Sequence, residues 1–542
     1  TGAYLTGSDT IDKHEGQTPA WRERVLVGGA SEVWAPAAAF VLTAVSIGLL
    51  AADDGGYFQG AWRLSTPLYA AVVIVILASA RDLRLPRAAL AVAAGLAGLC
   101  LWTAVSWLWS SDRPATVQDI RLVLVYVAGA AALLLIANRG RGVAVAGGVI
   151  AATVAVSCYS MASRLYPGTF GMYTTGGGYG RLYQPIGYWN ALGAFTVIGI
   201  ILSLGLAARG NMLVRMLAAA ALIPLAPTLY LTFSRGALVG LAAGLIALIA
   251  LDRRRVHLVA GICAGSIGAV GALVAVHAHP GLTTYYRHLQ IQAKEGAQTA
   301  ARMISLVPLA MGSAALLAGL EARVKVSRMA RIAAGAGMVA AACIAVAVGV
   351  NKFGDPVSVV RSAVKTFEKP APTFRGGDLN LRLLSLSPNG RVIFWKTGWH
   401  QFTAHPVVGS GGGSFARYWR IHRPVKIQNL YAHSLYLETL GELGVIGLAL
   451  LLVALLPPLW VGLHRRFHPL AAPVMAAYIA FLVHTGGDWT WQLPAVGLAA
   501  IACGAAAIGL VIDPDAVVLS RRVRAAGIVL AVGVGVVGAW GG

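Results

Sequence analysis

The chain alternates between long apolar runs and short polar connections. Most apolar runs are close to 20 residues long, which is enough for a helix to cross about 30 Å of hydrocarbon. This pattern predicts an all-α, polytopic membrane protein with about 14–15 transmembrane helices. The predicted spans are 33–52, 67–80, 88–109, 119–137, 143–163, 189–207, 212–233, 236–251, 256–277, 303–320, 330–350, 434–463, 470–487, 495–512 and 524–540.

One long polar stretch, 351–433, interrupts this pattern and divides the chain. We predict an N-terminal cytoplasmic tail at 1–32, because this stretch is too poor in apolar residues for a signal peptide. Transmembrane helices with short loops follow at 33–350. Residues 351–433 form a large extracytoplasmic loop that carries short helices, and residues 434–542 form the C-terminal transmembrane helices.

Composition agrees with a membrane protein. Hydrophobic residues make up 57% of the chain and charged residues only 12%, against about 25% charged in soluble domains. The formal net charge of +22 would suggest a nucleic-acid partner in a soluble domain. In a membrane protein it mainly reflects the excess of Lys and Arg on cytoplasmic loops, so we expect no nucleic acid here.

The basic clusters set the predicted orientation. They fall at alternate connections: Arg81, Arg84 and Arg87; Arg139 and Arg141; Arg209 and Arg215; Arg253, Arg254 and Arg255; Arg323, Lys325, Arg328 and Arg331; Arg465 and Arg466; Arg521, Arg522 and Arg524. One orientation puts all of them in the cytoplasm, with the N-terminus inside and the C-terminus outside.

The outer connections then carry unexpected basic residues. Loops 164–188, 279–302, 351–433 and 484–494 are rich in His, Arg, Trp, Tyr and Gly. Arginines there break the positive-inside pattern. An anionic ligand handled at the outer membrane face is the simplest cause.

Two candidate sites lie in the first half of the chain. Arg235, in the turn Ser234-Arg235-Gly236, is either a snorkelling Arg that ends a helix or a fixed cation for a phosphate, which the planar guanidinium suits. Arg181 and Asn190 lie in GRLYQPIGYWNALGAF. They are either a loop residue and a helix cap, or binding residues.

The stretch from 389 to 447 concentrates the remaining candidates. Arg391 heads NGRVIFWKTGWHQF, whose spacing suits an amphipathic helix near the bilayer. His405 precedes a proline that breaks this helix, and the glycine run GSGGGSF allows close backbone approach and movement of the loop. His433 opens HSLYLETLGELG and is either a cap or surface residue or a reactive group. Glu442, in a predicted span, must be neutral, paired or beside a polar cavity.

The last outer loop, HTGGDWTWQLP, adds Asp488 and Trp489. Asp488 follows His484 by four residues, the spacing of one helical face. Trp489 is either an aromatic-belt residue or a sugar-stacking platform. No spacing of His, Cys and carboxylates indicates a zinc site, and no phosphate-cradling glycine loop or kinase signature is present, so we expect no metal and no cofactor.

Taken in order, SRGA, NGRxxxW, HPVVGSGGGSF and HSLYLETLGELG resemble the O-antigen ligase and polymerase family of membrane glycosyltransferases. GRLYQPIGYWNALG resembles that family's first signature, to which Arg181 and Asn190 correspond. The resemblance implies that Arg235 and Arg391 bind a pyrophosphate and that His433 is at the reacting centre. Glu442 matches the family's acidic position, whereas Ser434 stands where the family usually has Asn.

The resemblance also implies a GT-C-like fold with an active site on the outer face of a bacterial inner membrane. The donor would be a glycan on a polyprenyl, undecaprenyl-type pyrophosphate, and the acceptor a glycan or lipid hydroxyl at the membrane. Transfer would need no metal, and one direct displacement would invert the anomeric centre. Arginines can stabilise the charge of the departing pyrophosphate, and a histidine can accept the hydroxyl proton.

Two other readings remain open on sequence grounds. A flippase or transporter of lipid-linked glycans would show charges scattered through its spans and repeated halves, whereas here the charges cluster in outer loops. A peptidoglycan polymerase-like enzyme would use the same type of donor, but the loop motifs fit it less well. The sequence does not separate a ligase from a polymerase.

Overall fold

The computed structural model of the protein describes residues 30–80, 82–170, 180–284, 289–323, 377–384, 390–464, 468–510 and 515–540, with Met329, Gly337, Asn351 and Asp513 in addition. The described chain is almost entirely helical, as predicted. Its two strands, β1 (Arg84–Leu85) and β2 (Val517–Val518), are two residues each and pair antiparallel.

Eleven described helices are long and apolar enough to cross a membrane. They are α2 (Ala30–Ala52), α3 (Gln59–Ser79), α4 (Arg87–Ser106), α5 (Arg113–Ala137), α6 (Gly142–Leu165), α8 (Trp189–Arg209), α9 (Met212–Leu231), α11 (Arg255–His277), α13 (Leu289–Arg323), α19 (Leu435–His464) and α22 (Arg521–Ala539). Three apolar helices are shorter: α10 (Arg235–Leu251), α20 (Ala471–Thr485) and α21 (Pro494–Gly509).

These helices confirm the predicted all-α polytopic class. Each predicted span among the described residues corresponds to one of them, and only 330–350 lies outside the description, as do most of the predicted tail 1–32 and most of the first half of the loop 351–433. Three boundaries were wrong. Helix α13 begins at Leu289, well before 303, α3 begins at Gln59 rather than 67, and α5 begins at Arg113 rather than 119. Polar first turns extend these helices beyond their apolar runs.

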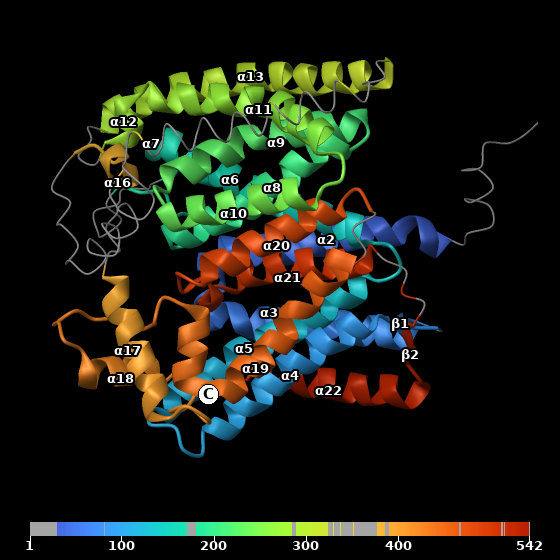
Figure 1. The fold of residues 1–542 in the computed structure, drawn as a ribbon, viewed down its shortest axis with the longest axis vertical. Helices are drawn as coiled ribbons and strands as arrows, with labels where there is room; N and C mark the ends of the chain where they lie inside the picture. Colours follow the sequence, from blue (N-terminus) through green and yellow to red (C-terminus); the bar gives the residue numbers. More distant parts are fainter. Residues whose placement is uncertain are drawn as a thin grey trace, which may run out of the picture.

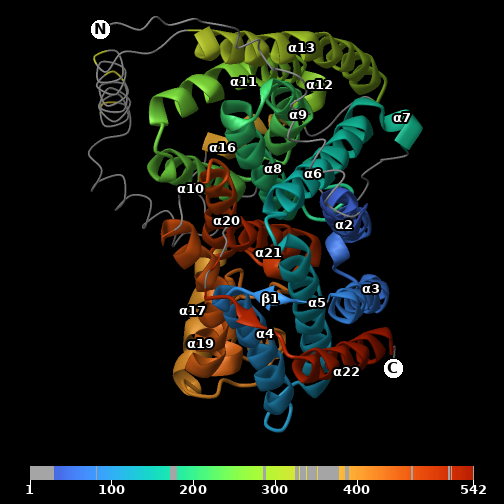
Figure 2. The ribbon, with the colours of Figure 1, turned by 90° about the vertical axis from the view of Figure 1, so that its right-hand side faces the viewer.

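The long helices lie roughly side by side, with α13, α11 and α9 at one edge and α4, α19 and α22 at the other (Figures 1 and 2). Five short helices occur among the described residues: α7 (Pro167–Phe170), α12 (Pro280–Thr283), α16 (Asn380–Leu384), α17 (Arg391–Ala404) and α18 (Phe415–His422). All five gather at one end of the bundle, whereas β1 and β2 lie at the other end (Figure 1).

The centre of the bundle is built from α8 and α21. Every residue of α21 is buried, and so is nearly all of α8. Small side chains permit this close packing, as is usual where helices associate without a hydrophobic driving force. A Cβ on Gly142, for example, would lie 2.4 Å from the Ala506 carbonyl oxygen.

The end that carries β1 and β2 also collects those members of the predicted basic clusters that the structure describes. Arg139 donates to the Asp82 carbonyl and Arg524 to the Ala80 carbonyl, so three separate connections meet there. Arg209 forms a buried ion pair with Asp252, and Arg215 forms one with Glu321 at 2.6 Å. We call this the basic end and the opposite one the site end.

The contact between α4 and α19 provides a test of the packing. A Cβ on Gly95 would lie 2.5 Å from the Ala454 backbone nitrogen, whereas a Cβ on Gly48, also in a helix, meets no atom within 4 Å. Overpacking of this kind typically costs about 1–3 kcal/mol. We therefore expect Gly95→Ala to lower the thermal unfolding temperature in detergent and Gly48→Ala to leave it unchanged or higher. Equal behaviour of the two variants would contradict the α4–α19 packing.

Candidate active site

Four segments separated along the chain meet at the site end. They are the loop 180–188 before α8, the turn 232–235 before α10, the stretch from α17 to the start of α19, and the loop 486–493 between α20 and α21. A left-handed glycine starts α17: Gly390 has φ +83°, which a residue with a Cβ adopts at a cost. This turn makes Arg391 the first residue of the helix.

The carboxylate of Asp488 is where these segments connect. It is 1% exposed and accepts hydrogen bonds from Tyr188 Oη (3.0 Å), Asn190 Nδ2 (2.7 Å) and the Trp489 backbone N–H (2.9 Å). It also pairs with the Arg391 guanidinium. A buried carboxylate is costly without such donors, and here the donors come from three separate segments.

These contacts decide the charge of Asp488. Burial by itself raises the pKa of this carboxyl, but the nearby Arg391 guanidinium and the His433 ring outweigh burial and hold the pKa well below its usual value of 3.8. Burial likewise lowers the pKa of Arg391, and Asp488 more than offsets that effect. Each partner thus favours the ionised form of the other.

His433 lies on the other side of this carboxylate. Its Nδ1 is 3.6 Å from Asp488 Oδ1 and makes no hydrogen bond within the described part of the chain. The ring stacks on Phe394 at 5.3 Å, and the Trp395 indole N–H donates to the His433 carbonyl at 3.1 Å. His433 has φ +55°, an uncommon conformation that surrounding contacts must hold and that is often found at functional sites.

Arg181 and Asn190 extend the network toward α10. Arg181 is buried and donates to the Thr232 carbonyl (2.6 Å) and to Asn190 Oδ1 (2.9 Å). Its guanidinium also lies 4.5 Å from the centre of the Trp189 ring. Asn190 thus joins Arg181 to Asp488. Burial, together with the positive charge of Arg382, lowers the pKa of Arg181 well below its usual value.

Arg235 is the first residue of α10 and is half-buried. The neighbouring Ser234 caps this helix: its hydroxyl accepts from the Ala237 N–H (3.2 Å) and donates to Asn190 Oδ1 (2.8 Å). These two bonds hold the turn that carries Arg235. This helix start lies close to Arg391 and to the His484 ring, since a Cβ on Gly236 would lie 4.0 Å from Arg391 Nη1 and 3.5 Å from His484 Nε2. The positive charges of Arg382 and Arg391 both act on Arg235.

Sequence reasoning missed two contributors. Arg382, in α16, acts electrostatically on both Arg181 and Arg235, yet nothing in NLRLL distinguishes it from other basic residues. Glu438 accepts from the Ala432 N–H (2.6 Å) and from Gln492 Nε2 (2.9 Å). It therefore ties the segment before His433 to the loop that carries Asp488. The sequence did offer a signal for Glu438, because it is an acidic residue in the first turn of the helix that follows His433.

Two predicted residues lie apart from this network. Glu442 is buried in α19, and its two carboxylate oxygens accept from the Gly413 and Phe415 N–H groups, so it anchors the glycine run. A Cβ on Gly409 would lie 2.1 Å from the Glu442 carbonyl, and one on Gly411 would lie 2.4 Å from Ser110. These glycines provide the close backbone approach that was predicted, whereas movement of the loop stays a prediction.

His405 ends α17 and is exposed. The 14-residue helix α17 separates it from Arg391 by about 20 Å at 1.5 Å per residue. The structure therefore does not bring His405 to the network around Asp488.

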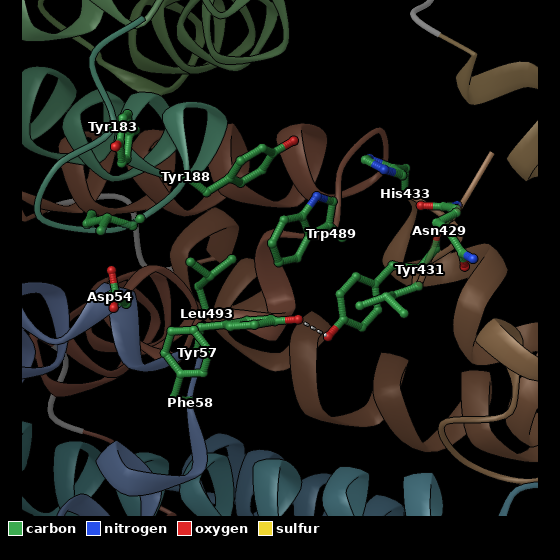
Figure 3. Close-up of a pocket in the computed structure, with 14 residues that line it drawn as sticks. Asp54, Tyr57, Phe58, Tyr183, Tyr188, Asn429, Tyr431, His433, Trp489 and Leu493 are labelled. Carbon is green, nitrogen blue, oxygen red and sulfur yellow. Dashed lines mark hydrogen bonds between the residues drawn. The ribbon is translucent and has the colours of Figure 1, made fainter. Parts of the chain in front are cut away.

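Trp489 is held between two tyrosines. Its ring stacks on Tyr188 at 4.5 Å and on Tyr431 at 5.0 Å, so both of its faces are covered (Figure 3). An open stacking platform on this indole, one of the two predicted alternatives, is therefore not present. Its edge instead lines a cavity of about 620 Å³ that also borders His433.

The fold and these contacts define a polytopic helical membrane protein with converging arginines and a histidine–carboxylate pair at one end. A sequence profile described as O-antigen ligase matches residues 296–452, which is less than a third of the chain and contains Arg391, His433 and Glu442. This match confirms the predicted resemblance to the O-antigen ligase/polymerase family. The chain is thus similar to a family of membrane glycosyltransferases. No curated protein matches it.

The matched segment leaves out Arg181, Asn190, Arg235 and Asp488. These four residues join the candidate site through the hydrogen bonds and charges described above, not through the family comparison. The structure therefore extends the candidate site to parts of the chain on both sides of the matched segment.

The charge of Asp488 predicts a pH-independent effect on stability. Because its folded-state pKa is depressed, its contribution is fully present above the unfolded value near 3.8 and is lost only as pH falls through the lower folded value. Breaking a buried ion pair costs about 3–5 kcal/mol. We expect Asp488→Asn to lower the thermal unfolding temperature by a constant amount between pH 5 and pH 9. A gap that narrows between pH 7 and pH 5 would show that Asp488 is protonated in that range.

Proposed function

We propose that the protein is a glycosyltransferase that moves a glycan from a polyprenyl, undecaprenyl-type pyrophosphate to an acceptor hydroxyl. The observation that carries this proposal is the pairing of His433 with Asp488 directly beside the Arg391 guanidinium and the start of α10. Such a site combines a proton acceptor with fixed positive charge. Both are needed when a hydroxyl displaces a pyrophosphate.

Arg391 and Arg235 are the proposed pyrophosphate-binding residues. Nη2 of Arg391 is held by Asp488 while Nη1 lies beside Gly236, so the guanidinium is oriented before substrate arrives. The first N–H groups of α10 add positive potential at the same place, which favours a phosphate. Arg382 contributes further charge, and Arg181 positions Asn190 and the turn before α10.

His433 is the proposed proton acceptor. The Asp488 charge favours the tautomer with its proton on Nδ1, which leaves the Nε2 lone pair for the acceptor hydroxyl. As the hydroxyl oxygen bonds to the anomeric carbon, its proton passes to His433. The bond from that carbon to the pyrophosphate oxygen breaks, and its electron pair stays on the pyrophosphate, where the guanidiniums stabilise it.

This single displacement would invert the anomeric centre. Guanidinium groups supply the positive charge throughout, so the proposed step is independent of metal ions and needs no cofactor.

We also propose how the protein is oriented in the membrane. The basic end faces the cytoplasm and the site end the extracytoplasmic side of the bacterial inner membrane, in a GT-C-like arrangement. This follows from the excess of basic residues at one end, where several connections bond to one another.

Thiol labelling tests this orientation. In a background with all five cysteines replaced by serine, Asn429→Cys at the site end should react with a membrane-impermeant maleimide in intact spheroplasts. Arg141→Cys at the basic end should react only after the membrane is opened. The reverse labelling pattern would overturn the orientation.

Transfer assays test the assigned roles. With purified protein and a polyprenyl-pyrophosphate glycan, we expect His433→Gln to lower kcat by about 10²–10⁴-fold while donor binding persists, because only proton transfer is lost. Arg391→Lys should raise the donor KM as well as lower kcat, since lysine lacks the planar fork.

The matched control for His433 is His464→Gln, at the far end of α19, which should keep wild-type kcat. Full transfer by His433→Gln would refute the base assignment. A product that retains the donor's anomeric configuration in its NMR spectrum would refute single displacement.

A further inference from the structure

The cavity beside His433 has a different chemistry from the arginine side of the site. Its walls are contributed by the turn at η1 (Asp54–Gly56), the loop before α8, the stretch 428–433 and the loop containing η2 (Thr490–Gln492). The described residues that line it are Asp54, Tyr57, Phe58, Tyr183, Ile186, Gly187, Tyr188, Gln428, Asn429, Leu430, Tyr431, His433, Trp489 and Leu493. None of them is an arginine or a lysine.

Aromatic rings and short polar groups alternate on these walls. Figure 3 shows Tyr57, Tyr188, Tyr431 and Trp489 around the cavity, with Asn429 and His433 on one side and Asp54 on the other. An exposed ring such as Phe58 can accept the C–H face of a sugar, whereas amides, phenols and a carboxylate bond its hydroxyls. A lipid tail would need aliphatic walls, and a phosphate would need cations. Neither predominates here.

The walls are fixed before any ligand arrives. Tyr57 Oη and Tyr431 Oη lie 2.9 Å apart, and Asn429 Nδ2 donates to the Tyr431 carbonyl at 2.7 Å. Tyr431 stacks on Trp489, which stacks on Tyr188, whose hydroxyl donates to Asp488. The cavity wall and the histidine–carboxylate pair thus belong to one connected set, and such preorganisation favours binding.

The turn at η1 is also built for close contact. Asp54, Gly55 and Gly56 all have positive φ, and a Cβ on Gly55 would lie 2.8 Å from Leu493. This turn places Asp54 and Tyr57 on the cavity wall from a part of the chain more than 370 residues away from Tyr431.

We propose that this cavity is the acceptor site and that it admits an uncharged sugar of the acceptor glycan. The inference rests on the proposed function, because His433 is assigned there as the proton acceptor. A sugar in the cavity can present a hydroxyl to His433, while the donor pyrophosphate occupies the arginine side. Among the described lining residues, Asp54 carries the one negative charge and no arginine or lysine carries a positive one. A phosphate on the acceptor sugar would be repelled by Asp54 and would find no cation, so a phosphorylated acceptor is disfavoured.

Saturation-transfer NMR on the purified protein tests this without any reaction. The probes are the methyl α-glycosides of glucose, galactose, mannose and N-acetylglucosamine, and the 6-phosphate of each. We expect at least one neutral glycoside to receive saturation on its ring C–H protons. Its signal should fall at least several-fold in Phe58→Ala and Asn429→Ala, and its 6-phosphate should bind more weakly.

Two further variants sharpen the test. Trp399→Ala removes an exposed aromatic residue of α17 that does not line the cavity, and it should keep the wild-type signal. Gln428→Lys adds a cation at the exposed rim and should strengthen binding of the 6-phosphate. In transfer assays, Phe58→Ala and Asn429→Ala should raise the acceptor KM by about tenfold and leave the donor KM unchanged.

The outcomes separate the two proposals. Absence of any neutral glycoside signal, equal loss in Trp399→Ala, or tighter binding of the 6-phosphates by the wild type would overturn the acceptor site and leave the transferase proposal standing. Neutral glycoside binding with the expected variant pattern supports the acceptor site even if no glycan transfer is detected. In that case the proposed function would fail on its own assay.

Discussion

A single buried carboxylate organises the site end of this protein. Asp488 is 1% exposed, and such a charge is tolerated in the interior only when donors surround it. Those donors are Tyr188, Asn190, the Trp489 backbone and Arg391, which come from loops far apart in the sequence. The need to satisfy one carboxylate therefore fixes the relative positions of the loops. It also orients the guanidinium and the histidine to which chemistry is assigned.

The same carboxylate separates two kinds of environment. On one side are arginines: Arg235 at the start of α10, Arg391 at the start of α17 beside it, and Arg382, whose charge acts on Arg235. On the other side is an aromatic cavity whose lining contains no arginine or lysine. His433 borders that cavity and Asp488 together. An anion would thus favour the arginine side and a neutral hydroxyl the aromatic side, which is consistent with the proposed donor and acceptor positions.

Much of this arrangement could be predicted from sequence, and particular residues show why the rest could not. Apolar runs predict helices well because a membrane span must be both long and apolar. Arg181 and Arg391 stood out because arginines on the outer connections break the positive-inside pattern, and Asn190, His433 and Asp488 lie in or next to the same connections. The hydrogen bond between Asn190 and Asp488 spans 298 residues, and no local pattern indicates such a contact. The roles of Arg382, Glu438 and the turn at Asp54 depend on similar long-range contacts. Glu442 was recognised as unusual, but the Gly413 and Phe415 N–H groups that its carboxylate binds were not.

The most direct test is a structure of the protein in lipid nanodiscs with a polyprenyl pyrophosphate bound, determined by electron cryo-microscopy. We predict phosphate oxygens within hydrogen-bond distance of both Arg235 and Arg391, at the start of α10, with Asp488 still facing His433. A pyrophosphate bound at the basic end, or in the aromatic cavity away from both arginines, would contradict this prediction.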